Sequence, residues 1–278
     1  MCTALSFRLQ RIHAFRLTSA EVDRLACFYV QALGFNAGPG HPIPPDELAL
    51  LGLAGSGYRI PLRLGNERLD LDAFDPPGRP YPGDAIAADL VFQHLALATS
   101  DAAAAWERAQ QCGATSLSVR GPVTLPQSAG GVTAVKFRDP EGHPLELLQF
   151  PAGANELWCP GHGVLGIDHS ALCVGDVQRA RDFFLDHGLE LGACTINAGA
   201  EQSMLDGLEP VRVEVVSLRP GTAPPHLELL AYRTPRGRRA APCAPNDIAA
   251  TRTVWQSDID ALVRDPAGHL HLLRQCPG

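Results

Sequence analysis

The sequence lacks an excess of basic residues, paired cysteines and any apolar run long enough to cross a bilayer. Its formal net charge is −7 over 278 residues, so it offers no basic footprint for nucleic-acid phosphates. The eight cysteines are scattered without a C-x-x-C pair, which disfavours a disulfide framework or a zinc knuckle. The N-terminal stretch has no apolar region typical of a signal peptide. These absences predict a cytoplasmic protein that binds neither nucleic acid nor membranes.

Motifs for nucleotide binding and for serine hydrolysis are missing as well. There is no G-x-G-x-x-G after a strand, no Walker motif and no G-x-S-x-G elbow. The hydrophobic content of 45% is ordinary for a globular chain, and the length suffices for two cores. The function therefore has to be inferred from the organisation of the chain and from its histidines and carboxylates.

The main positive feature is an internal repeat. Residues 11–36, 91–119 and 165–192 each have the pattern of a strand, an amphipathic helix and a glycine break. Each is followed by an alternating stretch that predicts a strand: "LRLGNERLDLDAF", "HPLELLQF" and "PHLELLAY". The units start about 75–80 residues apart, and each fits a βαβββ module.

A fourth unit begins near residue 246 and is shortened. Asp101 and Asp139 lie 38 residues apart in the second unit, whereas the corresponding Asp258 and Asp265 lie seven apart. The gap cannot hold a helix, so this unit retains only a first strand and a hairpin.

Proline- and glycine-rich connectors at 75–84 and 151–163 separate the units. The second connector is the better domain boundary. The prediction is a first domain, residues 1–152, and a second domain, residues 163–278. The first contains modules 11–75 and 88–151, and the second contains module 165–233 and the truncated module 246–274.

Four potential metal ligands occupy matched places in the second and third units. His94 and His169 lie in the first strands, and Glu146 and Glu228 lie in the last strands, each within "LELL". Because side chains alternate along a strand, a glutamate flanked by leucines points away from the leucine face. A lone histidine on a strand is usually structural and such a glutamate is usually solvated. The coincidence of all four favours a site for one divalent ion: Zn, Ni, Co, Mn or Fe(II).

The first and fourth units offer weaker candidates. His13 and Asp70 hold roughly the corresponding places in the first unit. In the fourth unit Arg252 falls on the histidine position, and a cation repels a metal ion. The register of the last strand is ambiguous between His271 and Leu272, and a slip of one residue reverses the face.

Two short motifs read as structural. The sequences "RDPEGH" (138–143) and "RDPAGH" (264–269) have the composition of tight turns, because proline fixes φ and glycine permits the bend. His143 and His269 are therefore expected to be turn residues.

With its βαβββ units, "FRDPEGHPLELL" near the end of one unit, and "FY" or "FF" followed by "LGF" or "HGLEL", the chain resembles the vicinal oxygen chelate superfamily. This superfamily includes glyoxalase I, extradiol dioxygenases, fosfomycin-resistance proteins and bleomycin-binding proteins. The resemblance implies an α+β fold, in which repeated modules form two curved mixed β-sheet half-barrels of glyoxalase type with helices packed outside.

The resemblance also implies that two modules share one metal site, built from their first and last strands. If modules pair as one-with-two and three-with-four, one site holds His13, Asp70, His94 and Glu146. If module two pairs with module three, His94, Glu146, His169 and Glu228 form one complete site. We favour the second pairing, since one intact site and one lost site explain the pattern with fewer coincidences.

The chemistry that the resemblance implies is chelation of vicinal oxygens of a small-molecule substrate and stabilisation of an enolate-like species. A glyoxalase-type isomerase or lyase, with Glu146 or Glu228 as the proton-transfer base and also as a metal ligand, is the preferred prediction. An Fe(II) extradiol-type ring-cleaving dioxygenase is one alternative. A non-catalytic binding or resistance protein is another. The expected oligomeric state is a monomer or a homodimer.

Overall fold

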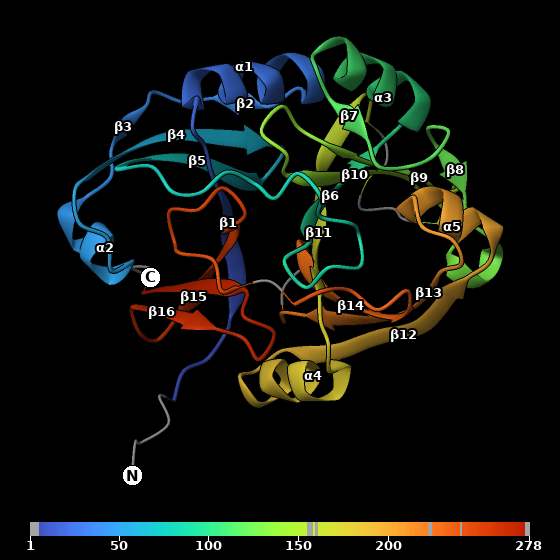
Figure 1. The fold of residues 1–278 in the computed structure, drawn as a ribbon. Coiled ribbons are helices and arrows are strands. Elements are labelled where there is room, and N and C mark those ends of the chain that lie inside the picture. The colour runs from blue at the N-terminus through green and yellow to red at the C-terminus, as the bar shows by residue number, and fades with distance from the viewer. Residues whose placement is uncertain (1–5, 155–157, 159–160, 222–223, 240, 276–278) are drawn as a thin grey trace.

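The protein, described here by a computed structural model, contains two mixed β-sheets with the three longest helices on their outer faces (Figure 1). All residues are described except 1–5, 155–157, 159–160, 222–223, 240 and 276–278. Within the described part of the chain, the first sheet has eight strands: β1 (Arg11–Thr18), β2 (Asn36–Ala37), β3 (His41–Pro42), β4 (Ser56–Leu64), β5 (Glu67–Asp75), β15 (Arg252–Ser257), β16 (Ala261–Arg264) and β17 (Leu270–Gln275).

The second sheet has nine strands by the same description: β6 (Gln93–Thr99), β7 (Thr115–Ser116), β8 (Val123–Thr124), β9 (Thr133–Arg138), β10 (Pro144–Gln149), β11 (Val164–Cys173), β12 (Glu190–Ala198), β13 (Arg212–Arg219) and β14 (His226–Thr234). The helices are α1 (Val22–Leu33), α2 (Pro45–Leu50), α3 (Ala102–Gln111), α4 (Val177–Asp186), α5 (Ala200–Asp206) and the 3-10 turn η1 (Gln127–Ala129). The predicted α+β class with two mixed half-barrel sheets is confirmed.

The strand pairing confirms the preferred arrangement of modules. In the second sheet β6 of module two runs antiparallel to β11 of module three. In the first sheet β1 of module one runs antiparallel to β15 of module four. Each sheet therefore joins modules from both predicted domains. The boundary between residues 152 and 163 stays a prediction about the sequence repeat, because the strand pairing crosses it.

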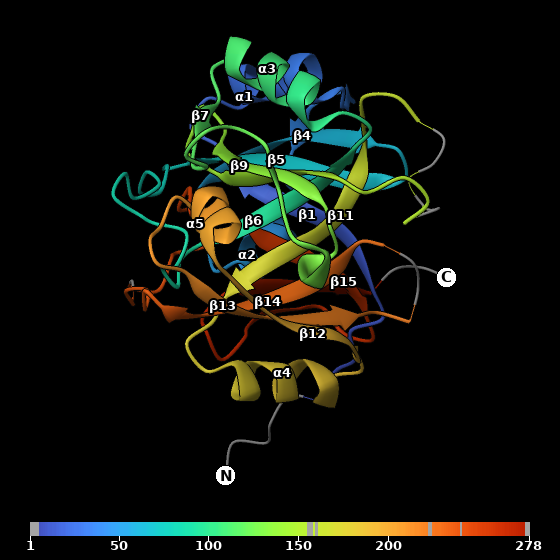
Figure 2. The same cartoon turned by 90° about the vertical axis from the view of Figure 1, so that its right-hand side faces the viewer.

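The truncation of module four leaves α4 without a helix partner. Helices α1 and α3 lie side by side at one end of the molecule, whereas α4 lies alone at the other (Figures 1 and 2). The N-terminal segment covers part of the α4 region: Phe7 is buried and stacks on His187, with ring centroids 3.9 Å apart. The Leu9 amide donates to the carbonyl of the same histidine at 2.8 Å.

Three elements differ from the sequence prediction. The stretch "LRLGNERLDLDAF" was predicted as a strand but forms the hairpin of β4 and β5, because Gly65 adopts a left-handed φ of 59° at the turn. Helices α2 and α5 were not predicted. Both are short, and neither carries a long amphipathic pattern. Helix α5 matters below because it lies over the candidate site.

The two predicted turns connect the sheets. In one turn the carboxylate of Asp139 accepts hydrogen bonds from the backbone N–H groups of Glu141 and His143. The ring Nε2 of His143 lies 3.0 Å from the carbonyl of Thr18, at the end of β1 in the other sheet. In the equivalent turn the ring Nε2 of His269 lies 2.9 Å from the carbonyl of Cys173, at the end of β11. Both histidines are turn residues, as predicted, and each also joins one sheet to the other.

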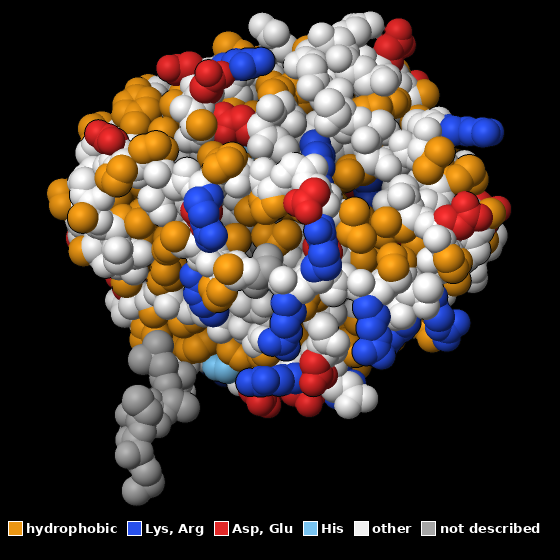
Figure 3. Space-filling model, in the orientation of Figure 1, with side chains coloured by type: hydrophobic (Ala, Val, Ile, Leu, Met, Phe, Trp, Pro, Cys, Tyr) orange, Lys and Arg blue, Asp and Glu red, His pale blue; other side chains and the backbone are white. Residues whose placement is uncertain are grey.

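Charged side chains of both signs are interspersed over the face shown in Figure 3. The only lysine of the sequence, Lys136, is buried, so the blue side chains on this face are arginines. Among the described residues, no helix has the length and apolar character needed to span a membrane.

Candidate metal centre

The four predicted ligands lie on one face at the centre of the second sheet. Glu146 in β10 pairs with Ala96 in β6, and Ala96 pairs in turn with His169 in β11. The same relation recurs on the other side of the module junction, where Glu228 pairs with Ala171 and Ala171 pairs with His94. The arrangement thus has approximate twofold symmetry. The two alanines leave room for the larger side chains beside them.

The side chains converge closely. Donor atoms of His94, Glu146 and His169 all lie within 4.8 Å of one another, and all three residues are buried. The Nε2 atom of His94 is 2.9 Å from a carboxylate oxygen of Glu146, and the Nε2 atom of His169 is 3.5 Å from a carboxylate oxygen of Glu228. Among the described residues, neither ring nitrogen of His94 has a partner with good hydrogen-bond geometry, although the side chain is buried.

Two further residues complete the group, and the sequence analysis missed both. The Nδ1 atom of His169 is 2.9 Å from the carboxylate of Asp168, which fixes the ring and leaves Nε2 facing the cluster. His226 lies 3.8 Å from Glu228 and forms a second group of potential ligands with Asp168 and His169. The adjacent pair "DH" at 168–169 and the histidine two residues before "ELL" were the available sequence signals.

Burial and the opposing charges set the protonation states. Burial lowers the pKa of His94 and outweighs the effect of Glu146. Burial disfavours ionisation of Glu146, but the field of Lys136 and the contact with His94 outweigh it and lower the pKa of Glu146. For His169 the burial effect is overcome by Glu228 and Asp168, which raise its pKa to about 9. His169 in turn overcomes the burial of Glu228 and lowers the pKa of that carboxyl to about 2.

These residues line a cavity of about 290 Å³. Strands β12, β13 and β14 supply one wall, helix α5 supplies Gln202 and Leu205, and the loop after η1 contributes Gly130. Apolar side chains such as Leu125, Leu148 and Leu230 form much of the remaining surface. A small polar centre within mostly apolar walls is typical of sites that bind small molecules.

The first sheet does not reproduce this centre. Asp70 occupies the place of Glu146, because it pairs with Arg16 of β1 as Glu146 pairs with Ala96. The place of His94 is occupied by Ala14 and not by His13. Phe15 pairs with Leu69 in the first sheet as Leu95 pairs with Leu145 in the second, so Phe15 corresponds to Leu95. The residue before each, Ala14 or His94, then holds the equivalent position. A β-bulge between Ile12 and Ala14 shifts His13 out of register.

Strand register also shows which residue of the fourth module, His271 or Leu272, holds the position of the glutamate. Leu272 pairs with Val254 as Glu228 pairs with Ala171, so Leu272 holds the place of Glu228. His271 faces the opposite side, where its Nδ1 atom lies 3.1 Å from the indole nitrogen of Trp255. Among the described residues, His13, Asp70 and His271 belong to no group of three potential ligands.

A buried ion-pair cluster takes the place of a metal centre in the first sheet. It combines three arginines with three carboxylates, all less than a tenth exposed: Arg16, Arg59, Arg252, Glu47, Asp70 and Asp72. Arg252 occupies the position of His169, as the sequence predicted, and its guanidinium lies 3.1 Å from Asp72. Because arginine is a permanent cation with no free electron pair, this arrangement excludes a metal ion.

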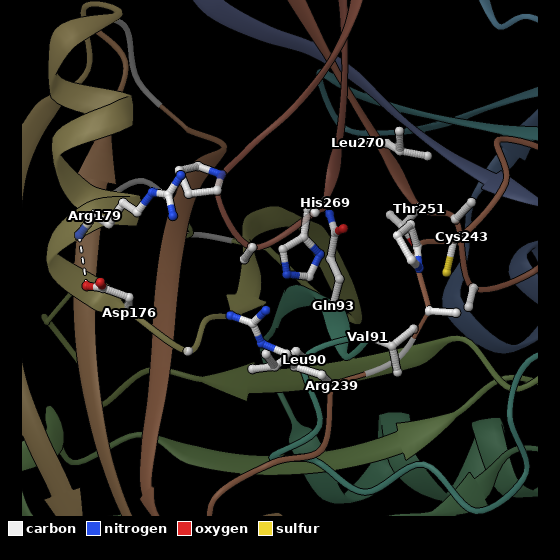
Figure 4. Close-up of a pocket in the computed structure, with 18 residues that line it drawn as sticks. Leu90, Val91, Gln93, Asp176, Arg179, Arg239, Cys243, Thr251, His269 and Leu270 are labelled. Carbon is white, nitrogen blue, oxygen red and sulfur yellow. Dashed lines mark hydrogen bonds between the residues drawn. The ribbon is translucent and has the colours of Figure 1, made fainter.

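A second cavity of about 340 Å³ lies where β6, β15 and β17 begin beside the N-terminus of α4 (Figure 4). Its lining includes Gln93, Cys243 and His269, and the side chains of Arg179 and Arg239 stand at its edge. None of these residues belongs to a group of potential metal ligands within the described chain. Among the described residues, the candidate metal ligands therefore all lie in the second sheet.

Comparison with known proteins supports the same reading of the fold. Residues 14–148 match the family model described as a glyoxalase-like domain. Glyoxalase I from Zea mays has a similar structure, with a TM-score of 0.61 and 15% identity over 96% of this chain and 92% of that chain. Residues 14–148 therefore have the sequence of a glyoxalase-like domain, and the chain as a whole has the fold of glyoxalase I.

A second solved structure with a similar fold has a different description. A Bacillus subtilis protein provisionally described as a dioxygenase has a TM-score of 0.56 and 15% identity, over 96% of this chain and 85% of that chain. At these identities the likeness shows the fold and not the reaction. No curated protein matches the sequence significantly.

Proposed function

We propose that this protein belongs to the vicinal oxygen chelate superfamily and is a divalent-metal-dependent enzyme of glyoxalase type, an isomerase or lyase acting on a small oxygen-chelating substrate. The observation that carries the proposal is the convergence of His94, Glu146 and His169, whose donor atoms lie within 4.8 Å of one another in a buried place. Among the described residues, Nδ1 of the buried His94 has no hydrogen-bond partner, and Nε2 contacts Glu146 at 2.9 Å without good hydrogen-bond geometry. A bound cation would satisfy a nitrogen of this ring.

The donor set fits a divalent ion. Two imidazoles and one or two carboxylates suit Zn, Ni, Co, Mn or Fe(II). The lowered pKa of His94 keeps its ring neutral and able to bind. The pKa of His169 is raised to about 9, so the ion would displace a proton from this ring. The Asp168 contact orients His169 as an outer-shell carboxylate does for a metal-bound histidine. Bound there, the ion would act as a Lewis acid on two adjacent oxygens of a substrate.

The two glutamates differ in ways that suggest different roles. Glu146 is 7% exposed and belongs to the tight three-residue group, so it is suited to holding the ion. Glu228 is 23% exposed and lies outside that group, next to His226. Glu228 would therefore move a proton between neighbouring substrate carbons, because binding of the ion would remove the charge on His169 that lowers the pKa of this carboxyl. The apolar walls of the cavity would exclude water from this transfer.

A dioxygenase is the second candidate, because the tight group of two histidines and one carboxylate has the composition of the facial triad that binds non-haem Fe(II). Such an enzyme would consume O2 with a catechol, whereas an isomerase or lyase would not. Oxygen-electrode assays of the iron-loaded protein with catechol therefore separate the two candidates.

Elemental analysis of freshly purified protein tests the metal site. We expect about one divalent ion per chain, loss of that ion in His169→Ala, and its retention in His13→Ala. His13 is a matched control, since it is a partly buried histidine in the corresponding strand of module one. Loss of metal in His13→Ala but not His169→Ala, or wild-type protein that takes up no metal, would refute the proposal. The latter result would favour a non-catalytic binding protein.

A further inference from the structure

The cavity beside the metal centre contains further polar atoms without partners. The side-chain oxygens of Asn197, Gln202 and Ser217 are buried and accept or donate no hydrogen bond within the described protein. All three residues line the same cavity as His94 and Glu228. Native proteins pair nearly all buried polar groups, so a concentration of exceptions in one cavity indicates a place where a polar ligand binds.

The orientation of the Gln202 amide specifies what that ligand must offer. Its nitrogen donates to the carboxylate of Asp206 at 2.9 Å, and an ionised carboxylate only accepts hydrogen bonds. The carbonyl oxygen Oε1 is therefore the atom without a partner, and it needs a donor. A hydroxyl group supplies that donor, whereas a carboxylate cannot.

The only lysine of the chain adds donors to the same subsite. Lys136 is 4% exposed, lies opposite Glu146 in the β9–β10 pair and lines the cavity. Its ammonium group donates to Asp206 at 2.6 Å, which uses one of its three N–H groups. Two N–H groups of Lys136 are thus left to donate to a ligand in the cavity.

Helix α5 creates this subsite by joining modules two and three. The hydroxyl of Ser118 donates to the carbonyl of Leu205 at 2.7 Å, and the amide of Val119 donates to the carbonyl of Met204 at 2.9 Å. These bonds hold Asp206, at the end of α5, against Lys136 of β9. The subsite therefore has a defined geometry rather than depending on mobile surface side chains.

The balance of charge disfavours an anionic ligand. Glu146, Asp168 and Glu228 line the cavity, and Asp206 stands behind Lys136. Four carboxylates, one ammonium and one divalent ion leave a net charge of minus one, which would repel a carboxylate. The cavity of about 290 Å³ is also too small to enclose a peptide-sized substrate.

We propose that Lys136, Asp206 and Gln202 form a specificity-determining subsite for a small uncharged hydroxy-carbonyl compound, whose vicinal oxygens face the metal centre. Lys136 donates to one of its oxygens, and one of its hydroxyl groups donates to Gln202. Asp206 neutralises Lys136 and so selects against acids. This inference rests on the proposed function, because the vicinal oxygens require a bound metal ion.

Two probes of the same carbon skeleton test the subsite: dihydroxyacetone, which is uncharged, and hydroxypyruvate, in which one hydroxymethyl group is replaced by a carboxylate. The cobalt-loaded protein is titrated with each, and dissociation constants are read from the visible absorption of the metal. A protein without a cobalt spectrum contradicts the proposed function. A cobalt spectrum together with tighter binding of hydroxypyruvate, or with no response to either probe, contradicts the subsite alone and assigns the cavity to ordered water.

The metal ion can itself bind one probe more tightly than the other, so each variant is compared with the wild-type protein on both probes. Asp206→Asn keeps the shape of the side chain but removes its charge, and should shift the ratio of the two dissociation constants toward hydroxypyruvate by about tenfold or more. Lys136→Met should weaken dihydroxyacetone binding by roughly tenfold to hundredfold. An unchanged ratio in Asp206→Asn refutes the role of charge.

Ser217→Ala keeps the test decisive if the variants of the buried ion pair fold poorly. The Ser217 hydroxyl has no partner in the described protein, so its removal should not lower the melting temperature. It should weaken dihydroxyacetone binding several-fold while metal content is unchanged. Unaltered binding of dihydroxyacetone in Ser217→Ala contradicts a ligand-binding role for the orphaned groups.

Discussion

The ion-pair cluster of the first sheet should respond strongly to the loss of one charge, and Asp72→Asn is the sharpest perturbation. Asp72 is fully buried and accepts from Arg59 at 2.6 and 2.9 Å and from Arg252 at 3.1 Å. At an effective dielectric constant of about 20, two unit charges about 3 Å apart attract by roughly 5 kcal/mol. Asparagine would also direct an N–H group at guanidinium donors. We expect a loss of about 3–5 kcal/mol in the free energy of unfolding, the range seen when a buried pair is broken.

Thermal or urea unfolding followed by circular dichroism measures this loss, which corresponds to a fall in Tm of roughly 6–20 °C. The control is Asp84→Asn, which removes an exposed carboxylate 2.7 Å from Arg238 and should barely change Tm. Adding Arg252→Met to Asp72→Asn should restore part of the stability, because the excess buried cation is removed. A loss below about 1 kcal/mol in Asp72→Asn, with no coupling to Arg252→Met, would refute the view that this cluster stabilises the first sheet.

Two further predictions concern the turns and the metal centre. Burial favours the neutral ring of His143, but Asp139 outweighs it and raises the pKa of His143 above the ordinary 6.5. The stability that the charged ring of His143 contributes is therefore complete below about pH 6.5 and is lost as the pH rises through the folded pKa. His143→Gln should lower the free energy of unfolding more at about pH 6 than at about pH 9. An equal loss at both pH values would contradict this. Asp168→Ala removes the carboxylate that orients the ring of His169, so it should weaken metal binding by about 10- to 100-fold in a competitive chelator titration. Unchanged affinity would show that Asp168 does not hold His169 in the orientation needed to bind the ion.

The repeat pattern was sufficient to predict the module plan and the main residues of the centre. Period-two alternation in "LELL" places the glutamates opposite the leucines, and the two copies of the motif identify matched positions for Glu146 and Glu228. The shortened fourth unit also correctly predicted the missing helix and the arginine at the place of His169. These are local properties of the chain, which sequence spacing records directly. Whether a metal ion binds there stays a prediction.

The sequence favoured the pairing of module two with module three but left the alternative open, and only the tertiary structure decided between them and showed which way ambiguous strands face. The pairing of β6 with β11 joins residues 65 to 79 positions apart, and no local pattern encodes it. His13 and His271 were misplaced or ambiguous because one bulge or one step of register turns a side chain to the opposite face. Asp206 approaches Lys136 only because an unpredicted short helix packs across a module boundary. The sequence by itself determined the residue types available for the site, whereas long-range packing determined which of them share a cavity, since that depends on contacts between segments far apart in the chain.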